Sequence, residues 1–323
     1  MSEEKLTIAC IGMGVIGCGW ATHFLGQGHN VRVWDPVEGV DERLNSYLDL
    51  AWPAMTELGI PEEANRENFI VCETIDQTIE GACLVQENAP ERLELKMDLI
   101  AELDEICSSD VVIASSTSGY LISHMTERCK KHPERVVVGH PFNPVYLLPL
   151  VEVVGGPKTS PESLIKAQEI YESTGKLVLR LDKEVDGFVS DRLQEAMWRE
   201  ALHMVANGEA TVEQLDLAIT AGPGLRWALM GPMLTFHLAG GEGGMAHMLD
   251  HFGPSLKSPW TRLEAPELTK ELRDAVVNGC EEEAAGRKVA DLVNQRDRGL
   301  VAIIKALRKS EVGTPGKGFQ DGT

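Results

Sequence analysis

The sequence predicts an α/β fold, with an N-terminal Rossmann-type doubly wound sheet followed by an all-helical C-terminal domain. In the first half of the 323-residue chain, short β-branched runs alternate with segments of helical spacing, as in a parallel sheet covered by helices on both faces. From Phe188 to about Arg308 the spacing is helical almost throughout, with glycine and proline as interruptions. We therefore expect a Rossmann domain over residues 1–185, a helical domain over 186–310 and a flexible tail over 311–323.

The expected strands of the first domain are apolar runs rich in β-branched residues. They are Leu6–Ile11, Val31–Trp34, Phe69–Cys72, Cys83–Gln86, Val111–Ala114, Val136–Gly139, Leu150–Val154 and Leu177–Leu181. Helical spacing between these runs is clearest at Val15–Gly26 and Glu91–Ile106. Ser160 followed by Pro161 is typical of a helix N-cap with proline in the first helical position.

Composition limits the classes of partner. The formal net charge of -20 argues against nucleic acid or an anionic membrane surface and favours a cation or a zwitterion. The seven cysteines are odd in number and form no CxxC pair, which favours reduced thiols and a cytoplasmic protein. The acidic N-terminus does not have the pattern of a signal peptide, and no apolar run is long enough to span a bilayer.

A glycine-rich turn follows the first expected strand. Gly12, Gly14 and Gly17 form the pattern GxGxxG between a strand and a helix, where the three glycines allow a tight turn, a close pyrophosphate and close helix packing. Asp35 ends the second strand, where a carboxylate can accept hydrogen bonds from a ribose 2′-hydroxyl and repel a 2′-phosphate. We expect NAD as the cofactor; an incidental turn and an FAD site are the alternatives.

A histidine and a glutamate form the candidate acid–base pair. His140 ends an apolar strand, and Glu152 lies on the next apolar run after a connection that contains three prolines. Oxidation of an alcohol by hydride loss needs a group that accepts the hydroxyl proton, and a histidine supported by a carboxylate is suited to this. The alternative is a structural histidine and an unrelated surface glutamate.

Two further groups of residues have competing interpretations. His247 and His251 have the i, i+4 spacing of metal ligands, but without a Glu-x-x-His context we expect a helix surface pair and no metal site. The hydroxyl-rich segment Ser115–Ser118 follows a strand at the edge of the sheet where ligands bind, and it could also cap the next helix.

Together these motifs resemble the 3-hydroxyacyl-CoA dehydrogenase superfamily, from about Lys5 to Arg308. The glycine turn, the hydroxyl-rich loop, the histidine–glutamate segment and the Asp-Gly-Phe-helix occur in the order of that superfamily. The longest matches are to the branch that oxidises L-carnitine, and they are Glu87–Leu93, Gly139–Gly156, Asp191–Leu193, Trp198–Leu202 and Gly224–Trp227. The resemblance implies hydride transfer from the C3 carbinol to NAD, in a homodimer formed through the helical domain.

The resemblance also implies roles for individual residues. His140 matches the general base, Glu152 the carboxylate that orients it, and Ser118 the serine that touches the substrate oxygen and the nicotinamide. The remaining implied cofactor contacts are Asn143 near the nicotinamide, and Glu91 and Lys96 near the ribose.

One position departs from the acyl-CoA members of the superfamily. Where they have an asparagine that faces the substrate, this chain has Asp191. A trimethylammonium group has no N–H to donate, so a carboxylate and aromatic faces must hold it. We expect Asp191 to supply the charge and Trp198 and Trp227 to supply aromatic walls, although either tryptophan could be core packing.

Three other functions remain as alternatives. Acyl-CoA is disfavoured because the segment from Pro36 to Phe69 has eight acids and only two bases, Arg43 and Arg66. The λ-crystallin-like L-gulonate 3-dehydrogenases share the architecture, but their neutral polyol carboxylate would give Asp191 no cation. A non-catalytic NAD-binding protein would not need the complete set Ser118, His140, Asn143 and Glu152.

Overall fold

The computed structural model describes residues 5–254, 267 and 269–310. Among these residues, one compact unit comprises the chain up to residue 191 together with residues 297–304, and a second comprises residues 192–296 and those from 305 onward. The expected boundary at residue 185 lies shortly before this division, and the sequence did not predict that part of the last helix belongs with the first unit. The expected tail, residues 311–323, lies outside the described residues.

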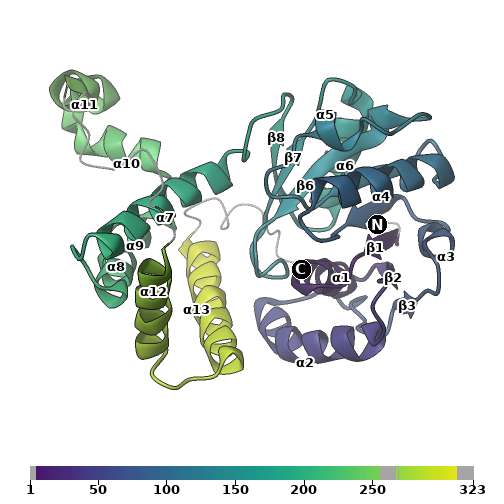
Figure 1. The fold of residues 1–323 in the computed structure, drawn as a ribbon, viewed down its shortest axis with the longest axis horizontal. Coiled ribbons are helices and arrows are strands. Elements are labelled where there is room, and N and C mark those ends of the chain that lie inside the picture. Colours follow the sequence, from purple (N-terminus) through teal and green to yellow (C-terminus); the bar gives the residue numbers. More distant parts are fainter. Residues whose placement is uncertain (1–4, 255–266, 268, 311–323) are drawn as a thin grey trace. The chain divides into compact units, whose positions relative to one another are not determined.

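The first unit is built on a single eight-stranded sheet in the order β3-β2-β1-β4-β5-β6-β7-β8 (Figure 1). The strands are β1 (Thr7–Ile11), β2 (Asn30–Trp34), β3 (Phe69–Val71), β4 (Leu84–Glu87), β5 (Val112–Ser115), β6 (Val136–Pro141), β7 (Leu150–Val154) and β8 (Leu177–Leu181). All eight predicted strands are confirmed. The strand order reverses between β1 and β4, and ligands of such sheets bind at the carboxyl ends of the strands at this point.

One pair of neighbouring strands differs from the expected parallel arrangement. β6 and β7 are antiparallel, whereas the neighbouring pairs β5–β6 and β7–β8 are parallel. The connection from Phe142 to Pro149 contains no helix, and a parallel pair needs a longer crossover, usually helical. The chain therefore turns back as a hairpin, and His140 comes to lie directly opposite Glu152 in the register.

Helices cover both faces of the sheet. They are α1 (Val15–Gly26), α2 (Val40–Leu58), α3 (Ile75–Ile79), α4 (Leu93–Ile106), α5 (Ile122–Met125), the short η1 (Pro133–Arg135) and α6 (Pro161–Ser173). Ile8 and Cys10 of β1 pack with α1, α2 and α6, while Ala9 and Ile11 pack with α3, α4 and α5. This alternation is the two-residue period of a strand buried on both faces. Ser160 caps α6 as predicted, with its Oγ accepting from Ser163 N at 3.1 Å.

The second half of the chain is helical, as predicted. Its helices are α7 (Ser190–Ala206), α8 (Val212–Thr220), α9 (Pro223–Trp227), α10 (Pro232–Ala239), η2 (Gly241–Gly243), α11 (Gly244–Phe252), α12 (Lys270–Ala284) and α13 (Val289–Ser310). Thr211 and Gln214 form a capping box that starts α8. Within the described helices, none combines the length and the apolar character needed to cross a membrane.

Candidate active site

The glycine turn between β1 and α1 has the geometry of a dinucleotide cradle. Gly12 has φ +86°, and a Cβ on it would lie 2.8 Å from the backbone of Asn88, so this position requires glycine. A Cβ on Gly17 would lie 1.9 Å from the carbonyl oxygen of Gly12, because α1 packs closely against the turn. A Cβ on Gly14 would meet no atom within 4 Å, and no side chain caps α1 there. The open space and the helix N-terminus fit a pyrophosphate.

Asp35 lies beside this turn, just after β2. Its Oδ2 accepts from the backbone N–H of Met13 at 2.6 Å, and its Oδ1 accepts from Val37 N at 2.8 Å. Arg43 lies nearby, with Nη2 3.7 Å from Asp35 Oδ1 and Nε donating to the Met13 carbonyl at 3.0 Å. The carboxylate is therefore fixed at the cradle, and Arg43 is a neighbour that the sequence pattern did not single out.

The hairpin of β6 and β7 brings His140 and Glu152 together. His140 Nδ1 lies 2.9 Å from Glu152 Oε2, and both side chains are buried. The other carboxylate oxygen, Oε1, accepts from Val189 N at 3.1 Å and from Ser190 N at 2.9 Å. The predicted proximity of His140 and Glu152 is confirmed, and Glu152 is held by groups on both sides.

These contacts affect the protonation of Glu152. Burial raises the pKa of the Glu152 carboxyl, but the hydrogen bond from His140 and those from the two backbone amides outweigh burial. The pKa of Glu152 therefore lies below its ordinary value, and the group is a carboxylate at neutral pH. An ionised Glu152 can orient the imidazole ring and stabilise a positive charge on it.

The turn that supplies the two amides was missed at the level of sequence. Phe188 has φ +52°, a left-handed conformation that is rare for a bulky residue, and it follows Gly187 with φ +63°. This turn directs the N–H groups of Val189 and Ser190 to the same oxygen of Glu152. The Phe188 ring is buried and its centroid lies 5.5 Å from that of His140. The Asp-Gly-Phe pattern marked the start of a helix but not this contact.

Asp191, in the first turn of α7, lies on the opposite side of the imidazole from Glu152. Its Oδ2 is 3.4 Å from His140 Nε2, and 26% of its side chain is exposed. The ring of Phe142 meets His140 edge-on with a centroid distance of 4.9 Å. His140 thus lies between two carboxylates and against two aromatic rings.

The hydroxyl-rich segment after β5 joins a cluster of charged side chains at the end of β4. Glu91 Oε1 accepts from Thr117 Oγ1 at 2.5 Å and from the backbone N–H of Ser118 at 3.2 Å. Ser118 is exposed at the end of this segment. The interpretation of the segment as a cap of the next helix is wrong, because Leu121 is the N-cap of α5.

Lys96 is the cation of this cluster. Its Nζ contacts Glu87 Oε1 at 3.0 Å, Glu91 Oε2 at 3.5 Å and the Ala89 carbonyl at 3.0 Å. Lys96 is 1% exposed and Glu87 is fully buried, whereas the side chain of Glu91 is 46% exposed. Of the two residues expected near the ribose, Glu91 is therefore accessible, and Lys96 holds it in place. Glu87 was not predicted as a member of the cluster.

A second buried network lies behind His140. Gln86 donates from Nε2 to Ser116 Oγ at 2.8 Å and to the Gly139 carbonyl at 3.2 Å, and it accepts from Tyr171 OH at 2.6 Å. Ser116 in turn donates to Asn88 Oδ1 at 2.7 Å. This network connects the strand of His140 with the residue beneath the glycine turn, and no sequence pattern indicated it.

The remaining predicted residues lie apart from these contacts. Asn143 is exposed in the β6–β7 connection. Trp198, on α7, and Trp227, at the end of α9, belong to the second unit and are 63% and 38% exposed. His247 and His251 stack on α11 with ring centroids 5.8 Å apart. Within the described part of the chain, no group of three or more His, Cys, Asp or Glu residues could hold a metal ion.

Comparison with known families explains the combination of these features. The model of the 3-hydroxyacyl-CoA dehydrogenase NAD binding domain matches residues 7–185, and the model of the C-terminal domain of the same family matches residues 187–288. The chain belongs to the 3-hydroxyacyl-CoA dehydrogenase family. It is an NAD-dependent dehydrogenase that acts on a 3-hydroxy substrate, and NAD is its cofactor.

Within this family, full-length relatives share a name. An L-carnitine dehydrogenase from Streptomyces coelicolor is 60% identical over 94% of this chain and 95% of its own. An L-carnitine dehydrogenase from Pseudomonas aeruginosa is 48% identical over 95% of this chain and 96% of its own. A solved structure, that of 5-formyl-3-hydroxy-2-methylpyridine 4-carboxylic acid 5-dehydrogenase, is 28% identical with a TM-score of 0.79, over 94% of this chain and 99% of that one.

Proposed function

We propose that this family member oxidises L-carnitine to 3-dehydrocarnitine. The observation that supports this most directly is the carboxylate of Asp191, 3.4 Å from Nε2 of His140. L-carnitine carries its trimethylammonium group one methylene away from the C3 carbinol. A hydroxyl group placed at His140 therefore brings a permanent cation close to Asp191, and the names of the full-length relatives agree with this substrate.

His140 acts as the general base in this proposal. It takes the proton of the C3 hydroxyl on Nε2, while Glu152 holds Nδ1 and stabilises the imidazolium that forms. Ser118, which is exposed next to Glu91, helps to position the substrate oxygen. NAD, when bound, would supply the acceptor for the hydride and its electron pair from C3, so that the carbinol would become a ketone.

The cofactor contacts follow from the cradle. The turn formed by Gly12, Gly14 and Gly17 receives the pyrophosphate at the start of α1, and Asp35 accepts hydrogen bonds from the adenosine ribose. The other proposed cofactor contacts, on the nicotinamide side, are Asn143, directly, and Glu91, which Lys96 and Thr117 hold in position.

Trp198 and Trp227 are the proposed aromatic walls for the trimethylammonium group. Each exposes a large part of its ring, as a residue that receives a ligand requires. Replacement of Trp227 by alanine should raise the KM for L-carnitine without changing the KM for NAD. An unchanged KM for L-carnitine would remove Trp227 from the site.

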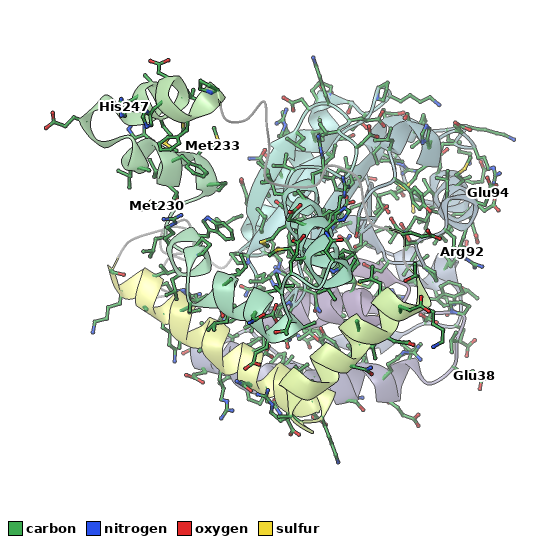
Figure 2. All side chains as sticks on the ribbon, turned by 60° about the vertical axis from the view of Figure 1, so that its left-hand side comes forward. Glu38, Arg92, Glu94, Met230, Met233 and His247 are labelled. Atoms are coloured by element: carbon green, nitrogen blue, oxygen red, sulfur yellow. The ribbon has the colours of Figure 1, made fainter. Side chains whose placement is uncertain are left out.

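Two properties of the whole molecule complete the proposal. We propose a homodimer formed through the second unit, because Leu217, Leu225 and Met233 are between 62% and 71% exposed there. Met233 is labelled on α10 in Figure 2. A cytoplasmic location fits the six described cysteines, which are free thiols. Light scattering at several protein concentrations tests the dimer, and a mass above that of the 35.3 kDa chain is expected.

A spectrophotometric assay tests the substrate. NADH formation should be observed with L-carnitine and be at least about tenfold slower, in kcat/KM, with L-gulonate and with a 3-hydroxyacyl-CoA. Turnover of L-gulonate without turnover of L-carnitine would contradict the proposal. The same outcome would leave membership of the family unaffected.

A further inference from the structure

Asp191 lies where the substrate hydroxyl must approach. Nδ1 of His140 is bonded to Glu152, so Nε2 is the nitrogen that is left to accept the hydroxyl proton. Oδ2 of Asp191 is 3.4 Å from that same Nε2. A carboxylate oxygen only accepts hydrogen bonds, so this contact is attractive when Nε2 carries a hydrogen atom. In this arrangement the carboxylate occupies the position beside Nε2 that the substrate hydroxyl must take.

The side chains around His140 leave little room for the substrate hydroxyl to reach Nε2 by another route. The rings of Phe142 and Phe188 pack against the imidazole at centroid distances of 4.9 and 5.5 Å, and the side chain is 5% exposed. The side chain of Asp191 is 26% exposed, so solvent and a ligand can reach its carboxylate. The substrate hydroxyl and the Asp191 carboxylate therefore compete for the same position.

We propose that Asp191 blocks His140 in the free enzyme, and that a substrate with a cation next to its carbinol removes the block. This inference rests on the proposed function and deepens it. The trimethylammonium group attracts the carboxylate of Asp191 by charge alone, since it has no hydrogen atom to donate. As Asp191 turns toward the cation, Nε2 becomes accessible to the C3 hydroxyl group.

Asp191 then determines specificity in two ways. It attracts the correct substrate, and it rejects 3-hydroxy acids that lack the cation, because these offer no positive charge to attract the carboxylate. Discrimination of this kind combines an attractive contact with the right substrate and an obstacle to the wrong one. If Asp191 only attracted the cation and did not block His140, removing Asp191 would not speed the oxidation of a substrate that lacks the cation.

The matched probe is the carbon isostere of L-carnitine, 3-hydroxy-5,5-dimethylhexanoate, in which a tert-butyl group replaces the trimethylammonium group. The two molecules have similar shapes and the same carboxylate and carbinol, but only one carries the cation. With the wild-type enzyme and NAD, we expect the kcat/KM for the isostere to be at least about tenfold below that for L-carnitine.

The deciding variant is Asp191→Ala. We expect its kcat/KM to fall by about tenfold or more for L-carnitine and to rise by about tenfold or more for the isostere. Asp191→Asn, whose amide oxygen can still accept from Nε2, should be slow with both substrates. Asp186→Ala is the control, because it removes an exposed acid from the same turn. The affinity for NAD, followed by fluorescence titration, should be unchanged in all three variants.

The outcomes separate the two proposals. If wild type oxidises L-carnitine but Asp191→Ala is no faster with the isostere, Asp191 does not block His140, and the inference is wrong while the proposed function stands. If wild type does not oxidise L-carnitine, the proposed function itself is wrong. A faster reaction with the isostere in Asp186→Ala would also overturn the inference, because the effect would then be one of general charge.

Discussion

His140 and Glu152 face each other directly across the antiparallel pair β6–β7, with Nδ1 of the histidine 2.9 Å from Oε2 of the glutamate. The hairpin fixes this distance through backbone register, so the orientation of the imidazole does not depend on a flexible loop. Replacement of His140 by glutamine removes the proposed base and keeps a polar side chain. We expect kcat to fall by about 10²-fold or more, with the Kd for NAD unchanged.

Stopped-flow measurement of NADH formation and fluorescence titration with NAD check this prediction. His124→Gln, on the short helix α5, is the control and should retain turnover. Full turnover by His140→Gln would exclude His140 as the base. Loss of NAD binding together with turnover would mean that the substitution acts on the fold.

The lowered pKa of Glu152 predicts how stability changes with pH. Because the pKa is below the ordinary value of 4.5 in the folded state, ionised Glu152 stabilises the fold at neutral pH. That contribution is complete above the ordinary value and is lost as the pH falls through the folded-state pKa. Wild type should therefore exceed Glu152→Gln in free energy of unfolding at pH 7, and the difference should shrink at acidic pH.

Urea unfolding of both proteins at several pH values measures this difference. Glu162→Gln, which changes an exposed acid on α6, is the matched control and should show no such trend. If the difference in free energy of unfolding between wild type and Glu152→Gln stayed constant from pH 7 to the lowest pH at which both proteins fold, the pKa of Glu152 would not be lowered in the folded state.

Lys176 should affect how stability changes at neutral to alkaline pH. It is buried, lies over the ring of Trp20 and donates to the carbonyl groups of Val145 and Leu148 in the β6–β7 connection. Burial lowers its pKa from 10.5 to about 7. Between these two values the unfolded chain binds more protons than the folded chain, so Lys176 makes stability rise with pH across this window.

Comparison with Lys176→Met isolates this effect. The free energy of unfolding of wild type, relative to the variant, should increase between pH 7 and pH 10. Lys183→Met, at an exposed position, gives the baseline. A relative stability that falls with pH would show that Lys176 remains charged in the folded protein.

The position of Asp35 predicts that the enzyme prefers NAD to NADP. Its carboxylate is held beside the glycine turn by Met13 N and should accept hydrogen bonds from the ribose hydroxyls of NAD. Asp35→Ala should raise the KM for NAD by about tenfold or more and reduce the preference for NAD over NADP. Glu38→Ala, an exposed acid labelled in Figure 2, is the control. An unchanged ratio of kcat/KM for the two cofactors would remove Asp35 from the ribose site.

Much of this architecture is predictable because it depends on local pattern. The eight strands follow from apolar runs, and the cap of α6 follows from Ser160 and Pro161. His140 and Glu152 could be paired because a connection stiffened by three prolines can bring them together. The sequence did not indicate that this connection makes β6 and β7 antiparallel, because the alternation of strands and helices predicts a parallel sheet.

Other features depend on contacts that sequence spacing does not encode. Gln86 reaches Ser116, Gly139 and Tyr171 across β4, β6 and α6, and nothing in its neighbours along the chain marks it as a buried hub. The contact between Asp191 and His140 depends on the left-handed turn at Phe188. This backbone conformation is common for glycine and rare for phenylalanine, so the sequence did not indicate the turn.

The central claim is that the C3 carbinol of L-carnitine delivers its hydride to NAD at this site. Incubation of the enzyme with NAD and L-carnitine deuterated at C3, followed by mass spectrometry of the reduced cofactor, tests it directly. We expect NADH that carries one deuterium atom and a slower reaction than with unlabelled L-carnitine. Reduced cofactor without deuterium, or no reduced cofactor at all, would contradict it.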